Sequence, residues 1–208
     1  MAYVLGFFLA DGSLVINKRG SHYLDFHITD GDILEKIKYH LGSNHKIQKR
    51  IRNEKHKMIF RLQIGSKKMF KSLNDLGIEK QKTGKEKMPP VPKKYFSDFL
   101  RGYFDGDGNI WSGYTNKNRK NPTPALTLTF TCKSKEFLSE LKDLMNKLKC
   151  TGNIVYSSKA YRLNFSTIPS LKIYESMYNN ITNDLYLLRK KVVFDKFINK
   201  FNRGIRIR

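Results

Sequence analysis

Two short motifs of this chain place an aspartate between an apolar run and a glycine. They are residues 4–12, VLGFFLADG, and residues 100–108, LRGYFDGDG, so Asp11 and Asp107 are 96 residues apart. Helical spacing of the apolar positions predicts two helices that end at Gly12 and Gly108, each glycine acting as a left-handed cap. A carboxylate at a helix C-terminus is disfavoured by roughly 0.3–1 kcal/mol, and a divalent cation with oxygen ligands would offset that cost. A lone Asp-Gly pair is an ordinary turn, but the duplication favours a metal site held by both aspartates.

Gly6 and Gly102 interrupt the apolar stripes five residues before the two aspartates. Glycine in a helix interior costs about 1 kcal/mol relative to alanine. The cost is explained if two helix backbones touch at these positions, which predicts that the motif helices pack side by side across a pseudo-twofold axis.

The rest of the chain repeats as well. Residues 24–29 resemble residues 126–131 at an offset of 102, and residues 61–64 resemble residues 162–165 at an offset of 101. Alternation with period two predicts strands over 24–28, 60–64, 126–130 and 161–165, and helical spacing predicts helices over 32–41, 67–76, 135–148 and 170–178. The expected fold class is α+β, with two pseudo-symmetric αββαββα halves. We assign 1–80 to the first half, 81–93 to a Pro- and Lys-rich linker, 94–182 to the second half and 183–208 to a basic C-terminal helix and tail.

The charge of the chain indicates a polyanionic partner. The formal net charge of +22 in 208 residues is carried by both halves, because residues 1–104 hold 21 Lys and Arg against 10 Asp and Glu, and residues 105–208 hold 19 against 8. Nucleic acid is favoured over an anionic membrane surface as the partner. The alternative is that the basic surface is only solvated and has no polyanionic partner. No apolar run approaches a membrane span and no signal peptide precedes the first motif, so an intracellular protein is expected, in a bacterium or phage-infected cell or in an organelle. Cys132, Cys150 and the five histidines lack metal-ligand spacing, which argues against a zinc site.

The two motifs resemble those of the LAGLIDADG homing endonucleases, and the resemblance covers nearly the whole chain. It implies a monomer whose two saddle-shaped antiparallel sheets lie in the major groove of a long, pseudo-palindromic double-stranded DNA target. It also implies that Asp11 and Asp107 bind Mg²⁺ or Mn²⁺, assisted by the backbone carbonyls of Ala10 and Gly106, and hydrolyse one phosphodiester bond in each strand. Leu9 departs from the family pattern, which has an aspartate there that Asp105 retains. Since that position is not the metal ligand, the departure does not argue against activity.

A lysine just after the second strand often assists catalysis in this family, and Lys133 matches that place. The first copy has no lysine there, which predicts unequal cutting of the two strands. Lys133 is expected to stabilise charge on the scissile phosphate; a plain lysine before a helix is the alternative, and Lys57 and Lys159 are weaker candidates for the role.

The outward strand faces are expected to read DNA bases, since one face of each antiparallel sheet is buried. Period two nominates Tyr23, Asp25, His27, Lys46, Gln48, Arg50, Arg52, Arg61 and Gln63 in the first half, and Thr127, Thr129, Asn153, Arg162, Asn164 and Ser166 in the second. A solvated strand face is the alternative for each of them. The lysines of the linker and tail would contact phosphates.

Two other functions compete with cleavage. A nucleic-acid-binding protein of the same fold, either an intron RNA maturase or a DNA-binding regulator, would gain nothing from two acids facing phosphates. A purely structural basic protein is disfavoured by the motif pair. The ends of the chain carry no splicing residues, so an intron-encoded or free-standing protein is expected.

Overall fold

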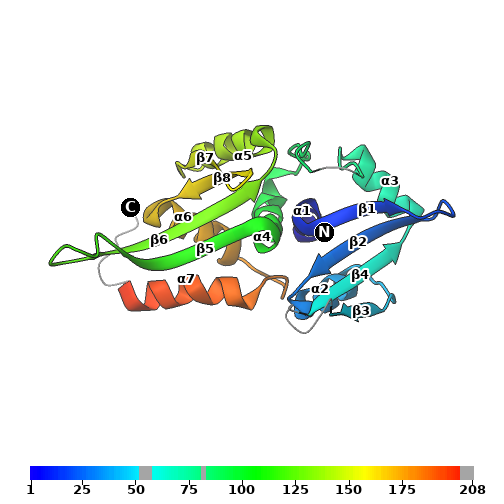
Figure 1. The fold of residues 1–208 in the computed structure, drawn as a ribbon, viewed down its shortest axis with the longest axis horizontal. Coiled ribbons are helices and arrows are strands. Elements are labelled where there is room, and N and C mark those ends of the chain that lie inside the picture. Colours follow the sequence, from blue (N-terminus) through cyan, green and yellow to red (C-terminus); the bar gives the residue numbers. More distant parts are fainter. Residues whose placement is uncertain (52–57, 81–82, 202–208) are drawn as a thin grey trace. The chain divides into compact units, whose positions relative to one another are not determined.

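The computed structural model describes residues 1–51, 58–80 and 83–201. The first half contains three helices and four strands (Figure 1). In chain order they are α1 (Ala2–Asp11), β1 (Gly12–Ile16), β2 (His22–Ile28), α2 (Gly31–His40), β3 (Ile47–Arg50), β4 (Ile59–Gly65) and α3 (Lys67–Asp75).

The second half repeats that order after the proline-rich segment and a short 3-10 turn, η1 (Lys93–Tyr95). Its elements are α4 (Phe96–Asp107), β5 (Gly108–Thr115), β6 (Thr123–Cys132), α5 (Lys135–Lys147), β7 (Asn153–Ser157), β8 (Ala160–Phe165) and α6 (Thr167–Tyr178), and α7 (Leu188–Phe201) follows them. The strand orders are β1-β2-β4-β3 and β5-β6-β8-β7, with every neighbouring pair antiparallel. The αββαββα repeat predicted from periodicity is confirmed.

The chain divides into two compact units. Unit 1 comprises Met1–Gly106 and Asn183–Tyr186, and unit 2 comprises Asp107–Thr182 and Leu187–Arg208. The limit between them falls in the last turn of α4, so nearly all of this helix belongs with the first half.

Each sheet buries one face under helices, as period two requires. In unit 1 Leu24, Phe26 and Ile28 of β2 are buried, and the ring of Phe26 packs edge-on against Phe8 of α1 with centroids 5.2 Å apart. In unit 2, Phe130 and Phe165 pack edge-on, and α5 adds the buried side chains of Phe137 and Leu141. Each such burial contributes about 1.5–3 kcal/mol, so these rows fix which face of each sheet remains outward.

Two details of the expected repeat are wrong. Gly12 is not a left-handed cap: its φ of −85° and ψ of 161° are extended, and β1 begins directly at this residue. Gly108 likewise begins β5. Glycine is needed at position 12 for space, since a Cβ there would overlap the ring of Phe8. The helix therefore passes into the strand without a turn.

The second correction concerns which residues of β2 and β6 are equivalent in the two halves. Gly12 pairs with Phe26, and Gly108 pairs with Phe130, so the structural equivalent of Phe26 is 104 residues away and not at the offset of 102 expected from the sequence. The apolar alternation is the same after a shift of two residues, so the sequence pattern alone did not fix the register. The longer β5–β6 hairpin accounts for the difference.

Candidate functional site

Helices α1 and α4 contact each other through their glycines, as predicted. A Cβ at Gly6 would overlap the carbonyl oxygen of Phe99, and a Cβ at Gly102 would overlap that of Tyr3. The Tyr3 hydroxyl also donates a 2.8 Å hydrogen bond to the buried carboxylate of Asp105. The contact is therefore made by backbone, with a side-chain bond that fixes the two helices in register.

The contact continues to the last turn of both helices. A Cβ at Gly106 would overlap the methyl group of Ala10 and would lie 3.5 Å from the backbone nitrogen of Asp11. Asp11 is the last residue of α1, and Asp107 is the last residue of α4. Both predicted metal ligands thus occupy helix C-termini, directly after the residues that bring the helices together.

The donor set at these helix ends is made of oxygen, namely two carboxylates and the neighbouring backbone carbonyls. Hard cations such as Mg²⁺ prefer these ligands, whereas zinc sites use cysteine and histidine. Within residues 1–51, 58–80 and 83–201 no group of three or more His, Cys, Asp or Glu could hold a metal ion. Each helix end, taken by itself, offers a carboxylate and backbone carbonyls, which are donors of the kind that Mg²⁺ accepts and that a transition-metal cluster does not favour.

A buried lysine that the sequence analysis did not single out lies beside the second motif. The side chain of Lys190 in α7 is 5% exposed, and its Nζ donates a 2.6 Å hydrogen bond to the carbonyl oxygen of Gly108, the residue after Asp107. Lys190, Phe194 and Phe197 share one buried helix face at spacings of four and three. Extending the apolar stripe of Phe194 and Phe197 back by one turn would have placed Lys190 on it.

Lys133, the predicted catalytic lysine, is exposed directly after β6. The next residue, Ser134, caps α5 by accepting a 3.2 Å hydrogen bond from the backbone nitrogen of Phe137. By strand register the equivalent of Lys133 in the first half is Thr29, so the asymmetry between the halves stands. Lys159 lies in the tight β7–β8 turn with a φ of 63°, and Lys57 lies outside the described residues.

The register of the first sheet gathers most of the nominated readers on one face. His27, Arg61 and Gln48 pair across three strands, and Asp25 pairs with Gln63. Tyr23 and Arg50 complete this outward face. Lys46 lies one residue before β3 begins, so it is not a strand residue, and Arg52 lies outside the described residues.

The second sheet gathers its readers in the same way. Its outward rows are Thr129, Asn164 and Asn153, and Thr131, Arg162 and Val155, while Thr127 pairs with Trp111. Ser166 is a correction: β8 ends at Phe165, and Ser166 is the N-cap position of α6. Trp111 was missed, although it is 43% exposed and alternation along β5 would have placed it on this face.

The outward face of the first sheet contains an ion pair. Asp25 is 3% exposed, and Arg61 donates to it from Nε, 2.8 Å from Oδ1, and from Nη2, 2.5 Å from Oδ2. These hydrogen bonds raise the pKa of Arg61 above its ordinary value, against the effect of burial. His27 Nε2 lies 3.2 Å from Asp25 Oδ1. The carboxylate therefore holds two of the nominated readers.

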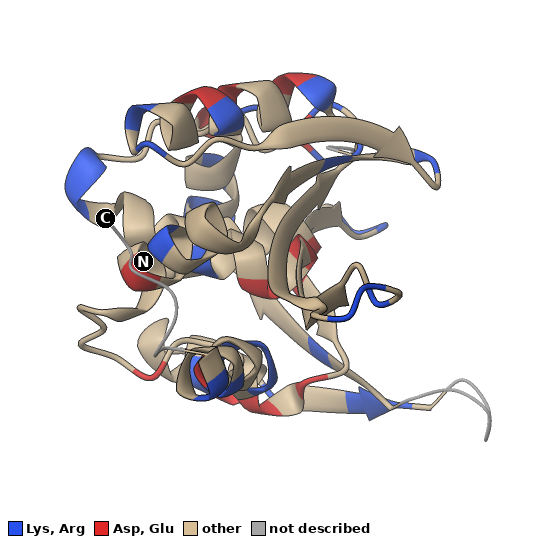
Figure 2. Cartoon of the chain, turned by 90° about the vertical axis from the view of Figure 1, so that its left-hand side faces the viewer, with Lys and Arg blue, Asp and Glu red and all other residues tan. Residues whose placement is uncertain are grey.

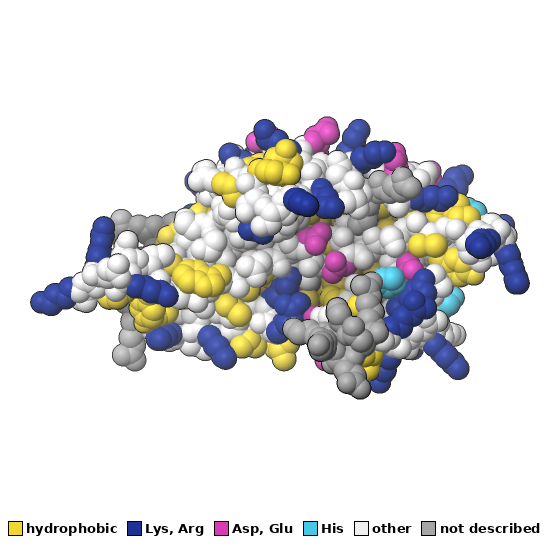
Figure 3. All heavy atoms as spheres, viewed as in Figure 1, with side chains coloured by type: hydrophobic (Ala, Val, Ile, Leu, Met, Phe, Trp, Pro, Cys, Tyr) yellow, Lys and Arg dark blue, Asp and Glu magenta, His cyan; other side chains and the backbone are white. Residues whose placement is uncertain are grey.

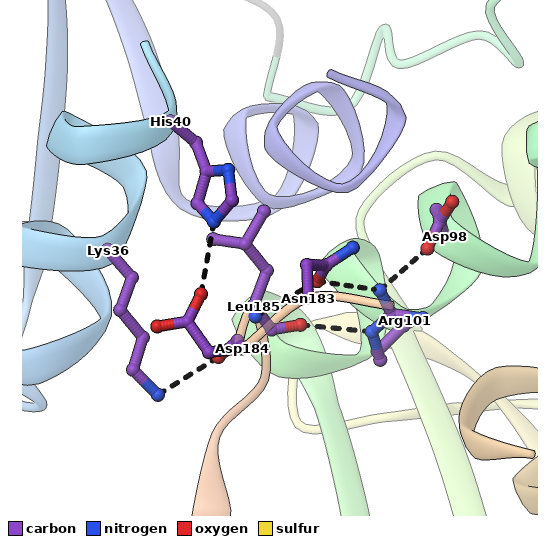
Figure 4. A network of polar contacts seen from close by, with 7 residues as sticks. All are labelled: Lys36, His40, Asp98, Arg101, Asn183, Asp184 and Leu185. Carbon is purple, nitrogen blue, oxygen red and sulfur yellow. Dashed lines mark hydrogen bonds and ion pairs between the residues drawn. The ribbon is translucent and has the colours of Figure 1, made fainter. Parts of the chain in front are cut away.

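A second polar network fixes the segment that precedes α7 (Figure 4). Arg101 in α4 is 1% exposed, and it donates from Nε to the carbonyl oxygen of Leu185 at 3.0 Å and from Nη2 to Asp98 at 2.6 Å. From α2, His40 Nε2 lies 3.0 Å from Asp184 Oδ1. This hydrogen bond is the main cause that lowers the pKa of Asp184. These contacts hold residues 183–186 against α2 and α4 within unit 1.

The remaining charge is spread widely. Lys and Arg occur on helices, strands and loops throughout the cartoon (Figure 2), and basic side chains outnumber acidic ones on the face drawn in Figure 3. In the part of the chain that the structure describes, no helix has the length and apolar character needed to cross a membrane.

Comparison with known proteins gives a family and a fold. The family model described as LAGLIDADG-like domain matches residues 1–76 and 97–201. An uncharacterized protein of Methanocaldococcus jannaschii is 28% identical over 119 residues, which is 54% of this chain and 40% of that protein. The matched stretch thus spans well under half the length of this relative.

Three solved structures share the fold over almost all of the chain. I-SmaMI bound to an uncleaved DNA target with calcium ions is 14% identical, with 98% of this chain and 91% of that chain covered and a TM-score of 0.67. The homing endonuclease I-LtrWI bound to target DNA is 12% identical, with 97% and 89% covered and a TM-score of 0.66. The meganuclease I-AabMI bound to uncleaved DNA is 13% identical, with 97% and 90% covered and a TM-score of 0.64. At these identities the likeness establishes the two-sheet architecture.

Proposed function

Because this chain belongs to the LAGLIDADG-like domain family, we propose that it is a site-specific endonuclease that hydrolyses phosphodiester bonds of double-stranded DNA with divalent metal ions. The observation that carries the proposal is the glycine-mediated contact of two helices that each end in an aspartate. A protein that only binds nucleic acid has no use for this arrangement, because two carboxylates at helix C-termini oppose both the helix dipoles and the phosphates.

The proposed roles follow from the chemistry of the side chains. Asp11 and Asp107 would hold Mg²⁺ or Mn²⁺, with the carbonyls of Ala10 and Gly106 as further ligands. A divalent ion held there would supply activation of water and stabilisation of charge on the phosphate and on the leaving oxygen. Lys133 supplies positive charge near the scissile phosphate. These assignments need no histidine or serine nucleophile.

Lys190 is proposed as a positioning residue. Its ammonium group holds the carbonyl of Gly108 at 2.6 Å, and Gly108 begins the strand that follows Asp107. Because Lys190 is almost fully buried, its charge must be compensated by such contacts. The lysine thereby fixes the backbone at Gly108, the first residue of β5, directly after Asp107.

DNA recognition is assigned to the outward faces of the two sheets. Their rows offer arginine, glutamine, asparagine and threonine side chains, which form hydrogen bonds with base edges in the major groove. The widely spread lysines add phosphate contacts and salt dependence. The solved relatives named above are bound to DNA in their crystals, which supports a monomer that binds a long duplex target.

The test is to select bound sequences from a random duplex library in Ca²⁺ and then to incubate the selected DNA in Mg²⁺. We expect a discrete double-strand cut in Mg²⁺ and none in Ca²⁺. Asp107→Asn or Asp11→Asn should reduce cleavage of at least one strand by about 100-fold or more, equal to about 2.7 kcal/mol of barrier. The matched control is Asp143→Asn, which changes an exposed aspartate of α5 and should cleave normally.

Two other outcomes would change the assignment. Site-specific binding without a cut in any metal would move the protein to the RNA maturase or DNA-binding regulator class, for which the same basic sheets suffice. Equal cleavage by wild type and Asp107→Asn would show that the helix-end aspartates are not the metal ligands. With Lys133 present in one half only, the nicked intermediate should carry predominantly one of the two possible cuts.

A further inference from the structure

Asp25 is an acid in an unexpected place. It lies in β2, one of the two inner strands, on the outward face of the first sheet, between Ser13 of β1 and Gln63 of β4 in the ladder. Under the proposed function this face meets DNA, where a carboxylate is repelled by phosphates. It is nevertheless only 3% exposed, and two side chains of the same face, Arg61 and His27, contact it.

Arg61 contacts this carboxylate directly, and the geometry of the pair is specific. Nε lies 2.8 Å from Oδ1 and 3.1 Å from Oδ2, and Nη2 lies 2.5 Å from Oδ2. Asp25 therefore occupies the Nε–Nη2 edge of the planar guanidinium. Covalent geometry directs the second edge, formed by Nη1 and Nη2, away from the carboxylate. A guanidinium held in this way is fixed in orientation before any ligand arrives.

We propose that Arg61 reads a guanine through this second edge and that Asp25 is the positioning residue that sets its orientation. The inference rests on the proposed DNA-binding function and adds the base and the residue that determine specificity in the first half. Guanine offers two acceptors, O6 and N7, on its major-groove edge, which match two parallel N–H donors. Adenine offers a donor at N6 in place of O6 and is rejected.

His27 is a second side chain that contacts the carboxylate of Asp25. It pairs directly with Arg61 in the ladder, and its Nε2 lies 3.2 Å from Asp25 Oδ1. One buried carboxylate thus holds two neighbouring side chains of a single row. Ordering an arginine costs side-chain entropy that is otherwise lost on binding, so this fixed arrangement favours both affinity and selectivity at one base pair.

The second half provides an internal contrast. Arg162 occupies the position equivalent to Arg61, and Thr129 occupies the position equivalent to Asp25. The Thr129 hydroxyl donates to Asn164 Oδ1 at 2.7 Å, so a neutral hydroxyl stands where the first half has a carboxylate. We therefore expect a strong guanine preference at the base facing Arg61 and a weaker one at the base facing Arg162.

The experiment is to sequence the duplexes that the full chain binds from a random library in Ca²⁺, for wild type, Arg61→Lys, Asp25→Asn and the double variant. Each good bidentate contact is worth about 1–3 kcal/mol of discrimination, or roughly 5- to 150-fold. Arg61→Lys should lower the guanine preference at one position by that factor. Asp25→Asn should lower it at the same position by about 5-fold or more, since an amide has only one acceptor oxygen for two donors.

Three comparisons separate a positioning role from a structural one. The double variant should show no further loss beyond Arg61→Lys, because Asp25 acts through Arg61. Arg162→Lys is the matched control and should affect a different position. Base ratios at one position do not depend on the fraction of folded protein, so a less stable variant still gives a valid profile.

The outcomes are distinguishable from failure of the proposed function. If wild type selects no motif, both proposals are overturned. If wild type selects a motif but Arg61→Lys leaves it unchanged, or if the base that changes is not guanine, this inference alone is wrong. An Asp25→Asn profile that keeps its guanine, or that relaxes at many positions equally, would make the ion pair merely structural.

Discussion

Replacing Gly102 by alanine should destabilise this protein, although alanine is the better helix former. Propensity alone predicts a gain of about 1 kcal/mol. A Cβ at residue 102 would overlap the carbonyl oxygen of Tyr3, and it would lie 2.8 Å from the carbonyl carbon of Tyr3 and 2.9 Å from the backbone nitrogen of Phe7. All three contacts are with backbone atoms of α1, so no side-chain rotation relieves them.

The cost follows from the separation of the two helices. Helix α1 would have to move by roughly 1 Å or more, and the buried rings of Tyr3, Phe7 and Tyr103 would lose packing contacts. Overpacking of this kind costs up to about 3 kcal/mol. Subtracting the propensity gain leaves a net loss of about 2 kcal/mol, which in a chain of this length lowers Tm by roughly 4–8 °C.

Urea denaturation with a check that the slope m is unchanged gives the loss directly. Gly42→Ala is the matched control: its φ is +60° and nothing lies within 4 Å of a Cβ there, so only backbone strain of roughly 1–2 kcal/mol is expected. Gly102→Ala should also impair cleavage, because the same helix carries Asp107, whereas Gly42→Ala should not. A stabilised Gly102→Ala protein would refute the helix contact.

Three further predictions concern other parts of the structure. Lys190→Met keeps the apolar stem but removes the hydrogen bond to the Gly108 carbonyl. Cleavage should therefore fall about tenfold or more, while Ca²⁺-supported DNA binding, measured by fluorescence anisotropy, stays within about twofold. An equal loss of cleavage and binding would show that Lys190 has only a structural role. The folded-state pKa of Asp184 is lowered, chiefly by its hydrogen bond with His40, so its contribution is present above the ordinary carboxyl pKa of about 3.9 and is lost as pH falls through the lowered value. Urea titrations of wild type and Asp184→Asn should therefore differ by about 0.5 kcal/mol or less at pH 6 and converge in acid, and a gap that widens there would contradict the assignment. Burial raises the pKa of the Cys150 thiol, so a thiol reagent should label it slowly in the native protein and at once in denaturant, which rapid native labelling would contradict.

The local patterns of the sequence were sufficient for the elements and for the repeat. Period two located β2, β4, β6 and β8, and helical spacing located the helices between them, because burial on one face leaves a regular trace in residue type. The need for space at Gly6 and Gly102 was also predictable, since glycine weakens a helix and is retained in a buried stripe where a second backbone comes close. The two helix-end aspartates followed from the same motifs.

The tertiary structure decided what depends on register and on long-range contact. The alternation of β6 is unchanged by a shift of two residues, so only its pairing with β5 gave the true equivalence of Phe26 and Phe130. The structure also corrected the role of Gly12: its backbone is extended and not left-handed, and a Cβ there would overlap the ring of Phe8.

Charged side chains were the least predictable part, because their partners are distant in the chain. Asp25 and Arg61 are 36 residues apart, and Lys190 and Gly108 are 82 apart. Residue type allowed each charged side chain to bind a ligand of opposite charge or to face solvent, and only the fold determined which of them contact another protein group. The sequence thus determined the two motif helices, the two sheets and the helix-end aspartates through local periodicity. The orientation of the side chains that would act on DNA was decided by packing between strands and helices that are far apart in the chain.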